Sequence, residues 1–250
     1  MPQRLPVEIA VQDAEGVRIA LEEGAARVEL CQALGLGGLT PSAGLIESAV
    51  EASAAVGVAG FVHVLVRPRG GGFVYSADER AAIARDIRLC ARLGADGVVV
   101  GALDEDGRID LDALAAFVDA AGEIDVTVHR AVDAAADPVA AVAALAGRGV
   151  RRVLTSGGAP TCAEGVDGLA AMLRESGGRL ELMAGGGVRP DDVGTLAALG
   201  VDAVHLSARR TIVAGPGGPG GGSDGYDATD RDVVARAVAL ASAHSIPLVE

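Results

Sequence analysis

The stretch RLGADGVVVG (residues 92–101) contains the unit from which most of the chain is built. A helix-like segment ends at a glycine, and an apolar run rich in valine follows within a few residues. Glycine just after a helix supplies the left-handed backbone that ends it, and a short run of β-branched residues is typical of a buried strand. The same unit recurs in EEGAARVELC (22–31), AGRGVRRVLTSGG (146–158) and ALGVDAVHLSA (198–208). The sequence therefore predicts alternating helices and strands.

This rhythm assigns strands and helices along the whole chain. Strands are expected to begin near Val7, Arg27, Phe61, Gly97, Asp125, Arg151, Leu180 and Ala203. Helical stretches are expected near 13–23, 42–56, 77–93, 110–121, 137–147, 162–176, 190–199 and 228–244. Eight strands alternating with eight helices in 250 residues have the size and order of an α/β fold, the (β/α)8 or TIM barrel. A doubly wound open sheet is the alternative, but it usually needs fewer strands, and no GxGxxG motif opens the first helix.

The barrel is expected to fill residues 1–250 as one domain without a linker. The Gly/Pro-rich residues 215–226 are predicted to form a flexible loop between the last strand and the last helix. Several helices have good starting residues: Asp13, Ser42 after Pro41, Ser76 with Glu79 three residues later, and Pro190.

Composition narrows the class of protein. No apolar run reaches the length of a membrane span, and the start MPQRLPVEIA lacks a signal-peptide pattern, so a cytoplasmic protein is predicted. The net charge of −13 argues against nucleic acid or an anionic membrane as partner. All 21 basic residues are arginine. The missing lysine excludes a Schiff-base aldolase and a pyridoxal enzyme, since both need a lysine amine.

Alternation along the strands predicts a polar barrel interior. In DVTVHRAVD (125–133), Val126 and Val128 share one face, while Thr127 and His129 share the other. The same pattern in four other strands places polar side chains opposite a valine- or leucine-rich face. The expected inward polar set is Glu8, Glu29, His63, Arg67, Thr127, His129 and His205. Because buried polar groups are costly unless paired, this interior must be a hydrogen-bonded network, a ligand site, or both.

The strand carboxyl ends are where such barrels carry out chemistry. Cys31, Arg67, His129 and Ser207 are expected nearest that end. His129 is the first candidate for catalysis, either as a general base or as a neutral donor to a carbonyl. Glu8 and Glu29 are candidate carboxylate partners, and one of their pKa values should rise if they lie close together. For His63 and His205, a hydrogen-bonded core histidine is at least as good an interpretation.

Glycine-rich turns after several strands predict anion binding, because glycine lets backbone N–H groups approach a phosphate. The candidates are Ser156, Gly157 and Gly158 after the sixth strand, and Gly185, Gly186 and Gly187 after the seventh. RPRGGG (67–72) could clamp a carboxylate or phosphate through Arg67 and Arg69. Ser207 completes this predicted anion site.

Seven ordered motifs together resemble the copper homeostasis protein CutC family. They are RVELC with GLGGLTPSAGLI (27–46), LVRPRGGGFVYS with Asp78 and Glu79 (65–79), GVVVGALDEDGRID (97–110), TVHRAVD (127–133), RVLTSGG (152–158), MAGGGVR (183–189) and HLSA (205–208). The resemblance implies a (β/α)8 barrel, a cytosolic location, a homo-oligomer and a role in copper handling, including copper(I) binding.

Two hypotheses follow for function. In the first, the protein binds copper(I), with Cys31 as the soft ligand; this rests on the resemblance, since no CxxC or HxxxH motif is present. A small buried cysteine without a metal is the competing interpretation of Cys31. In the second, the protein is an enzyme for a small phosphorylated or carboxylated molecule. His129, Glu8, Glu29 and Arg67 would then do the chemistry and hold the ligand.

Overall fold

Eight parallel strands close into a barrel in the computed structural model, which describes residues 3–213 and 225–246. The strands are β2 (Val7–Val11), β3 (Arg27–Leu30), β4 (Val62–Leu65), β5 (Gly97–Val100), β6 (Asp125–Val128), β7 (Arg152–Thr155), β8 (Glu181–Gly185) and β9 (Ala203–Leu206). They pair in sequence order, and β9 returns to β2. The predicted (β/α)8 barrel is therefore confirmed, and the predicted strand starts are correct to within one residue.

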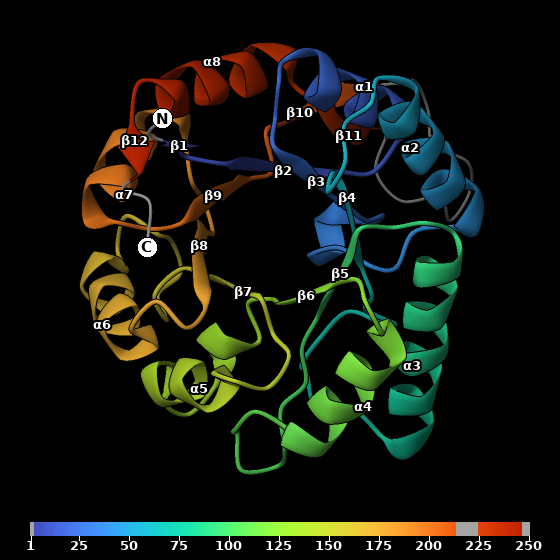
Figure 1. The fold of residues 1–250 in the computed structure, drawn as a ribbon, viewed down its shortest axis with the longest axis vertical. Helices are drawn as coiled ribbons and strands as arrows, with labels where there is room; N and C mark the ends of the chain where they lie inside the picture. Colours follow the sequence, from blue (N-terminus) through green and yellow to red (C-terminus); the bar gives the residue numbers. More distant parts are fainter. Residues whose placement is uncertain (1–2, 214–224, 247–250) are drawn as a thin grey trace.

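Helices surround the barrel on its outer side (Figure 1). They are α1 (Ala14–Glu22), α2 (Ala43–Ala55), α3 (Ala77–Arg92), α4 (Leu111–Ala121), α5 (Pro138–Leu145), α6 (Val166–Ser176), α7 (Val193–Leu199) and α8 (Arg231–Ser242). Short 3-10 helices add η1 (Leu34–Leu36), η2 (Val132–Ala134) and η3 (Pro190–Asp192). The predicted caps form: Ser76 accepts from the Glu79 amide, and the Glu79 carboxylate accepts from the Ser76 amide in return.

Three details differ from the sequence prediction. The helix expected from residue 162 begins at Val166, because the chain first makes a turn in which Thr161 Oγ1 accepts from the Glu164 amide. Two small sheets were not predicted: β1 (Gln3–Arg4) with β12 (Ser245–Ile246), and β10 (Arg209–Val213) with β11 (Gly225–Thr229). The second of these corrects the predicted loop at 215–226, since residues 225 and 226 belong to a strand; residues 214–224 lie outside the described part.

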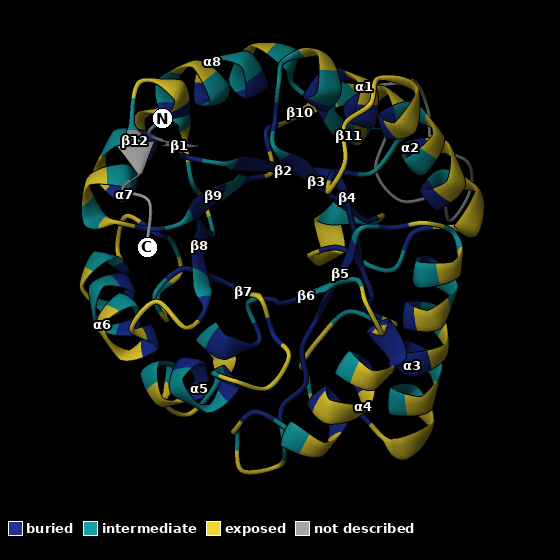
Figure 2. Cartoon of the chain, viewed as in Figure 1, coloured by how far each residue is buried: buried dark blue, intermediate teal, exposed yellow. Residues whose placement is uncertain are grey.

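One apolar core lies between the strands and the helices. The outward strand residues, such as Val62, Val64, Val126 and Val128, are all almost completely buried in it. In Figure 2 the strands and the inner helix faces are buried, while the outer helix faces are exposed. This arrangement leaves the opposite face of each strand for the barrel interior.

The barrel interior is polar, as the alternation predicted. Glu8, Glu29, His63, Arg67, Thr127 and His129 are buried, and His205 is half-buried. Two small apolar clusters lie among them: Cys31, Leu65 and Val99, and Leu154, Met183 and Ala203. These clusters show that Val99 of β5 and Leu154 of β7 point into the barrel.

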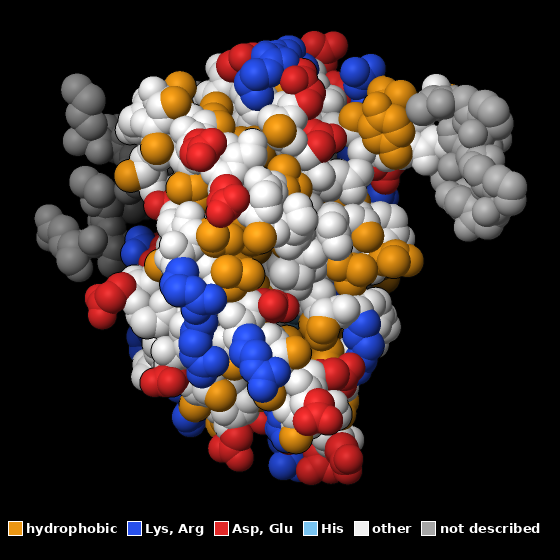
Figure 3. All heavy atoms as spheres, turned by 90° about the vertical axis from the view of Figure 1, so that its right-hand side faces the viewer, with side chains coloured by type: hydrophobic (Ala, Val, Ile, Leu, Met, Phe, Trp, Pro, Cys, Tyr) orange, Lys and Arg blue, Asp and Glu red, His pale blue; other side chains and the backbone are white. Residues whose placement is uncertain are grey.

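The outer surface mixes charges of both signs. Figure 3 shows arginine and acidic side chains interspersed over the face that lies on the right of Figure 1. Arg80 and Asp110 form one ion pair that links α3 to the start of α4, with 2.7 Å between Nη1 and Oδ2. Among the described residues, no helix is both long and apolar enough to cross a membrane.

Candidate active site

A pocket of about 310 Å³ opens at the carboxyl ends of the barrel strands. Its wall consists of Ala10, Glu29, Leu34, Gly37, Leu65, Arg67, Phe73, His129, Arg130, Leu154, Gly186, Gly187, Val188, His205, Ser207 and Arg209. Glu29, Arg67, His129, Gly186, Gly187 and Ser207 were predicted from the sequence. The structure therefore brings six predicted site residues from separate strands and loops to one place.

A carboxylate–imidazole–carboxylate chain runs from this pocket into the barrel. His205 Nδ1 lies 2.7 Å from Glu8 Oε1, and His205 Nε2 lies 3.8 Å from Glu29 Oε2. The other oxygen of Glu8 accepts from Arg27 Nε at 2.6 Å. Glu8 is therefore fully paired below the pocket, while Glu29 lines the pocket itself.

The pKa values of the two glutamates are shifted in opposite directions. Burial raises the pKa of Glu29 to about 7, and the nearby Glu8 charge adds to this against the opposing charge of His205. Burial alone would also raise the pKa of Glu8, but Arg27 and His205 together hold it well below its usual range. Hydrogen bonding to Glu8 and the charges of both glutamates raise the pKa of His205 despite its burial. The pKa of one glutamate is thus raised, but burial is the main cause and the neighbouring carboxylate the smallest one.

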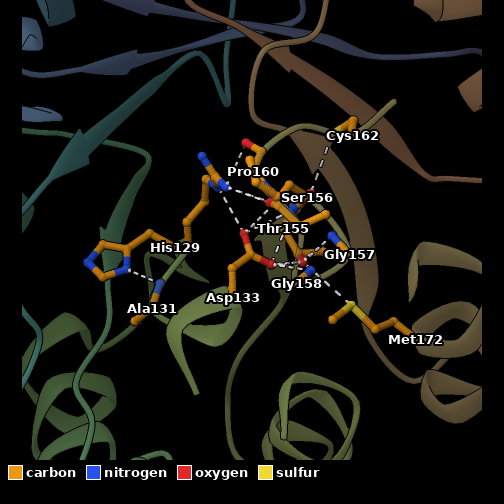
Figure 4. Close-up of polar contacts among 12 residues, drawn as sticks. His129, Ala131, Asp133, Thr155, Ser156, Gly157, Gly158, Pro160, Cys162 and Met172 are labelled. Carbon is orange, nitrogen blue, oxygen red and sulfur yellow. Dashed lines mark hydrogen bonds and ion pairs between the residues drawn. The ribbon is translucent and has the colours of Figure 1, made fainter. Parts of the chain in front are cut away.

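His129 follows β6 and is held in one orientation. Its Nδ1 accepts a hydrogen bond from the Ala131 amide at 3.1 Å (Figure 4). The Phe73 ring packs on it with 4.9 Å between the ring centroids. A side chain at Gly101 would clash with it, since a Cβ there would lie 2.5 Å from His129 Cε1. Burial, with help from the Arg67 charge, lowers the pKa of His129 to about 4.

Most hydrogen bonds of the Arg67 guanidinium go to the carbonyl oxygens of two loops. Its Nη1 donates to the carbonyl oxygens of Leu36, Gly37 and Gly38, each at 3.2 Å, and its Nη2 donates to Gly71 at 2.8 Å. Its guanidinium also lies over the Phe73 ring. Among the described residues, its buried Nε has no partner. Most of its donors are therefore used to hold the two loops, so the predicted clamp on a ligand through Arg67 is not supported by these contacts.

Arg69 does not reach the pocket. It forms an ion pair with Glu79, and its guanidinium lies 5.0 Å from the centre of the Tyr75 ring. Its remaining donors bind carbonyl oxygens of its own loop. The predicted role of Arg69 in anion binding is therefore not supported, because all this hydrogen bonding keeps it on the loop.

The turn at 156–158 already contains an anion, the Asp133 carboxylate (Figure 4). Asp133 accepts from the amides of Ser156 and Gly158 at 3.0 Å each, and from the Ser156 hydroxyl. The Gly157 amide donates to Thr155 Oγ1. The predicted phosphate cradle at Ser156, Gly157 and Gly158 is corrected here, because its amides bind an internal carboxylate.

The turn at 185–187 is different. Gly185 belongs to β8 and packs close to His205, and a Cβ there would lie 2.9 Å from His205 Cβ. Gly186 and Gly187 line the pocket with Val188. Within residues 3–213 and 225–246, the N–H groups of Gly186, Gly187 and Val188 have no hydrogen-bond acceptor. This turn keeps the donors that the sequence predicted for an anion.

Among the pocket residues outside the predicted site, Arg130, Arg209 and Phe73 add charge or an aromatic ring to the wall. Arg130 donates to Asp133 and Ser156 and lies against Gly186. Arg209, at the start of β10, pairs with Asp227 at 2.8 Å. Phe73 stacks between Arg67 and His129. Arg130 and Phe73 lie in the motifs TVHRAVD and LVRPRGGGFVYS, whereas Arg209 lies in none of the seven motifs. The direction of loop side chains is not encoded by strand alternation.

Cys31 does not have the surroundings of a copper ligand. It is fully buried in the apolar cluster with Leu65 and Val99, and its Sγ lies 3.5 Å from the Val11 carbonyl oxygen. Burial raises the pKa of its thiol, whereas metals bind the thiolate. Among the described residues, no group of three or more His, Cys, Asp or Glu side chains could hold a metal ion. The residues around Cys31 therefore do not fit a copper ion.

The comparisons with known proteins agree on the family. The model of the CutC family matches residues 5–210. A family protein CutC of Xylella fastidiosa (strain 9a5c) is 40% identical over 241 residues, covering 94% of this chain and 88% of the relative. A family protein CutC of Xanthomonas campestris pv. campestris (strain B100) is 42% identical over 209 residues, covering 83% of this chain and 85% of the relative.

Solved structures give the same result. The crystal structure of CutC from Streptococcus agalactiae, described as a candidate copper homeostasis protein, has a TM-score of 0.74 and 28% identity. It covers 81% of this chain and 98% of that one. Thiamine phosphate pyrophosphorylase from Pyrococcus furiosus has a TM-score of 0.59 at 15% identity, with 95% of each chain covered, and this likeness shows the fold alone.

Proposed function

Because the chain belongs to the CutC family and carries this pocket, we propose that it is an enzyme of that family. Its substrate would be a small molecule with a phosphate or carboxylate group, bound at the carboxyl end of the barrel. The family name connects it to copper homeostasis, and the proposed chemistry is acid–base catalysis.

The main support for this proposal is the row of three side chains formed by Glu29, His205 and Glu8. A general base works best when its pKa lies near the operating pH, and burial brings the pKa of Glu29 to about 7. His205 lies between Glu29 and Glu8, and the pKa of Glu8 is held well below its usual range by Arg27 and His205. His205 can therefore share a proton with Glu29 as the charge of Glu29 changes. A buried carboxyl with a strongly raised pKa, next to a pocket and a histidine, is a typical arrangement of a catalytic group.

Positive charge and free amides support an anionic ligand. Arg67, Arg130 and Arg209 all line the pocket, and Glu29 is the single acidic side chain among its described lining residues. The N–H groups of Gly186, Gly187 and Val188 add donors of the kind that bind phosphate. A cavity of about 310 Å³ suits a small molecule.

Copper(I) binding is the second candidate function, favoured by the likeness to the streptococcal protein. It would need Cys31 as thiolate. The apolar surroundings of Cys31 count against it, and the same pocket supports the enzymatic proposal without this residue.

Calorimetric titrations with inorganic phosphate and with copper(I) separate the two candidates. Phosphate is expected to bind the wild type, and Arg130→Gln is expected to weaken it about tenfold, because hydrogen bonds to charged groups contribute that much. Cys31→Ser should leave phosphate binding unchanged. Tight, stoichiometric copper(I) binding that is lost in Cys31→Ser, in anaerobic competition with a chelator, would overturn this choice.

A further inference from the structure

We propose that His129 is a fixed, neutral hydrogen-bond donor for an oxyanion, and that the substrate is therefore an anionic carbonyl compound with a hydrogen on the adjacent carbon. The proposal deepens the proposed function and rests on it, because it assigns a reaction class to the same pocket. Glu29 would remove the proton, and His129 would stabilise the negative charge that appears on the carbonyl oxygen.

The tautomer of His129 follows from its backbone contact. The Ala131 amide can only donate, and it lies 3.1 Å from His129 Nδ1. Nδ1 must therefore present its lone pair, and in a neutral ring the proton is then on Nε2. This arrangement makes His129 a donor through Nε2 and removes the alternative of a general base acting through Nδ1.

The Nε2 atom has no partner among the described residues, although it is buried and its residue lines the pocket. A buried donor without an acceptor costs free energy, so native structures rarely keep one without a reason. The ring cannot easily turn to find another acceptor, because Phe73 and the glycine at 101 confine it. A ligand oxygen in the pocket would satisfy this donor.

Burial, with a smaller contribution from the Arg67 charge, keeps the ring neutral and lowers its pKa to about 4. A neutral imidazole is a suitable donor to a carbonyl oxygen that becomes an enolate, because it strengthens its hydrogen bond without transferring a proton first. The chain contains no lysine, so activation of the carbonyl as a Schiff base is not open to it. A hydrogen-bond donor is the route that these residues offer.

The proposed step balances with the groups in the pocket. The Glu29 carboxylate takes the proton from the carbon next to the carbonyl. The C–H electron pair becomes the new C=C bond, and the carbonyl π pair moves to oxygen, where the enolate accepts from His129 Nε2–H. Glu29 then returns the proton to the same carbon: the C=C pair re-forms the C–H bond, and the pair on oxygen re-forms the carbonyl, so the step exchanges this hydrogen with the proton held by Glu29. No oxidant or reductant is consumed.

Nitrogen NMR of histidine in the wild-type protein tests the tautomer directly. The chain has four histidines, and the signal that disappears in His129→Asn identifies this one. The expected result is a neutral ring protonated on Nε2 from pH 8 down to about pH 5. A ring protonated on Nδ1, or an imidazolium at pH 6.5, would overturn the proposal.

Binding of 2-phosphoglycolate tests the role, because its carboxylate imitates an enolate next to an anionic group. His129→Asn keeps an acceptor near the Ala131 amide but has no donor at the Nε2 position, whereas His129→Gln has a donor there. His129→Asn is expected to weaken 2-phosphoglycolate about tenfold or more and to leave inorganic phosphate nearly unchanged, with His129→Gln weakened less.

The binding results distinguish failure of the anionic pocket from failure of the role proposed for His129. If the wild type binds neither phosphate nor 2-phosphoglycolate, the proposed function fails and this inference fails with it. If both bind and His129→Asn binds 2-phosphoglycolate as tightly as the wild type, the role of His129 is wrong while the anionic pocket stands. Equal losses in His129→Asn and His129→Gln would also contradict a specific Nε2 donor.

Discussion

Two histidines line the same pocket from surroundings of opposite charge. On the acidic side, His205 contacts Glu8 and Glu29, and its pKa is raised. On the basic side, His129 lies near Arg67, and its pKa falls to about 4. The comparison teaches that residue type does not set the role of a titratable group. The charge and burial around each ring decide whether it holds a proton near pH 7.

Among these substitutions, Glu8→Gln is expected to reduce the free energy of unfolding the most. Glu8→Gln removes the negative charge that pairs with Arg27 and His205 inside the barrel. Removing one partner of a buried ion pair costs about 3–5 kcal/mol, so unfolding in urea at pH 7 should show a loss of this size. Glu15→Gln, which affects a surface pair with Arg18, is the control and should leave the unfolding midpoint nearly unchanged.

The contributions of His129 and His205 to stability should depend on pH with opposite signs. The folded-state pKa of His129 lies below the ordinary value of 6.5, so the unfolded chain binds more protons, and stability is lost as pH falls from 6.5 toward 4. The contribution is up to about 3 kcal/mol. The raised pKa of His205 has the opposite sign: its stability is present below pH 6.5 and is lost as pH rises through the folded-state pKa.

Unfolding of the wild type, His129→Asn and His205→Asn from pH 4 to 9 measures both contributions as differences. The difference for His129→Asn reports mainly that ring, whereas the difference for His205→Asn also includes shifts of Glu8 and Glu29, whose pKa values His205 lowers. Differences with the same sign of slope for the two variants would contradict the opposite environments.

Gly101→Ala should displace the His129 ring and leave the surroundings of His205 unchanged. A Cβ at this position would lie 2.5 Å from His129 Cε1, so the ring or the strand must shift. Overpacking of this kind costs about 1–3 kcal/mol. Gly44→Ala is the matched control, since no atom lies within 4 Å of a Cβ there. Thermal unfolding measures the loss, and weaker 2-phosphoglycolate binding in Gly101→Ala alone would link it to the position of His129.

Glu29→Gln should have the smallest effect on stability. Burial brings the pKa of this carboxyl to about 7, so near neutral pH it is often uncharged and resembles an amide. The free energy of unfolding should change by less than about 1 kcal/mol, in contrast with the same substitution at Glu8. A loss as large as that of Glu8→Gln would mean that Glu29 is a permanently charged structural partner.

The fold and the barrel interior could be predicted from sequence because strand geometry is regular. Alternation placed Thr127, His129 and His205 inward, since every second side chain of a barrel strand must point to the same side. The glycines after the helices fixed the strand starts to within one residue. These features depend on local rules that act on a few neighbouring residues.

The loops were harder because their roles depend on partners far away in sequence. The turns at 156–158 and 185–187 look alike, yet Asp133 fills the first and has no counterpart among the described neighbours of the second. Arg67 was expected to bind a ligand but binds carbonyl oxygens of two loops. Long-range hydrogen bonding of this kind leaves no periodic signal in the sequence.

Carbon NMR of glutamate side-chain carboxyls, titrated from pH 3 to 9, measures the protonation of Glu29 and Glu8 site by site. Glu29→Gln identifies the signal of Glu29, and Glu8→Gln that of Glu8. We predict that Glu29 titrates near pH 7 and that Glu8 stays ionised over the whole range. A midpoint of Glu29 near the ordinary value of 4.5 would contradict the account, because the pocket would then hold no base poised near neutral pH.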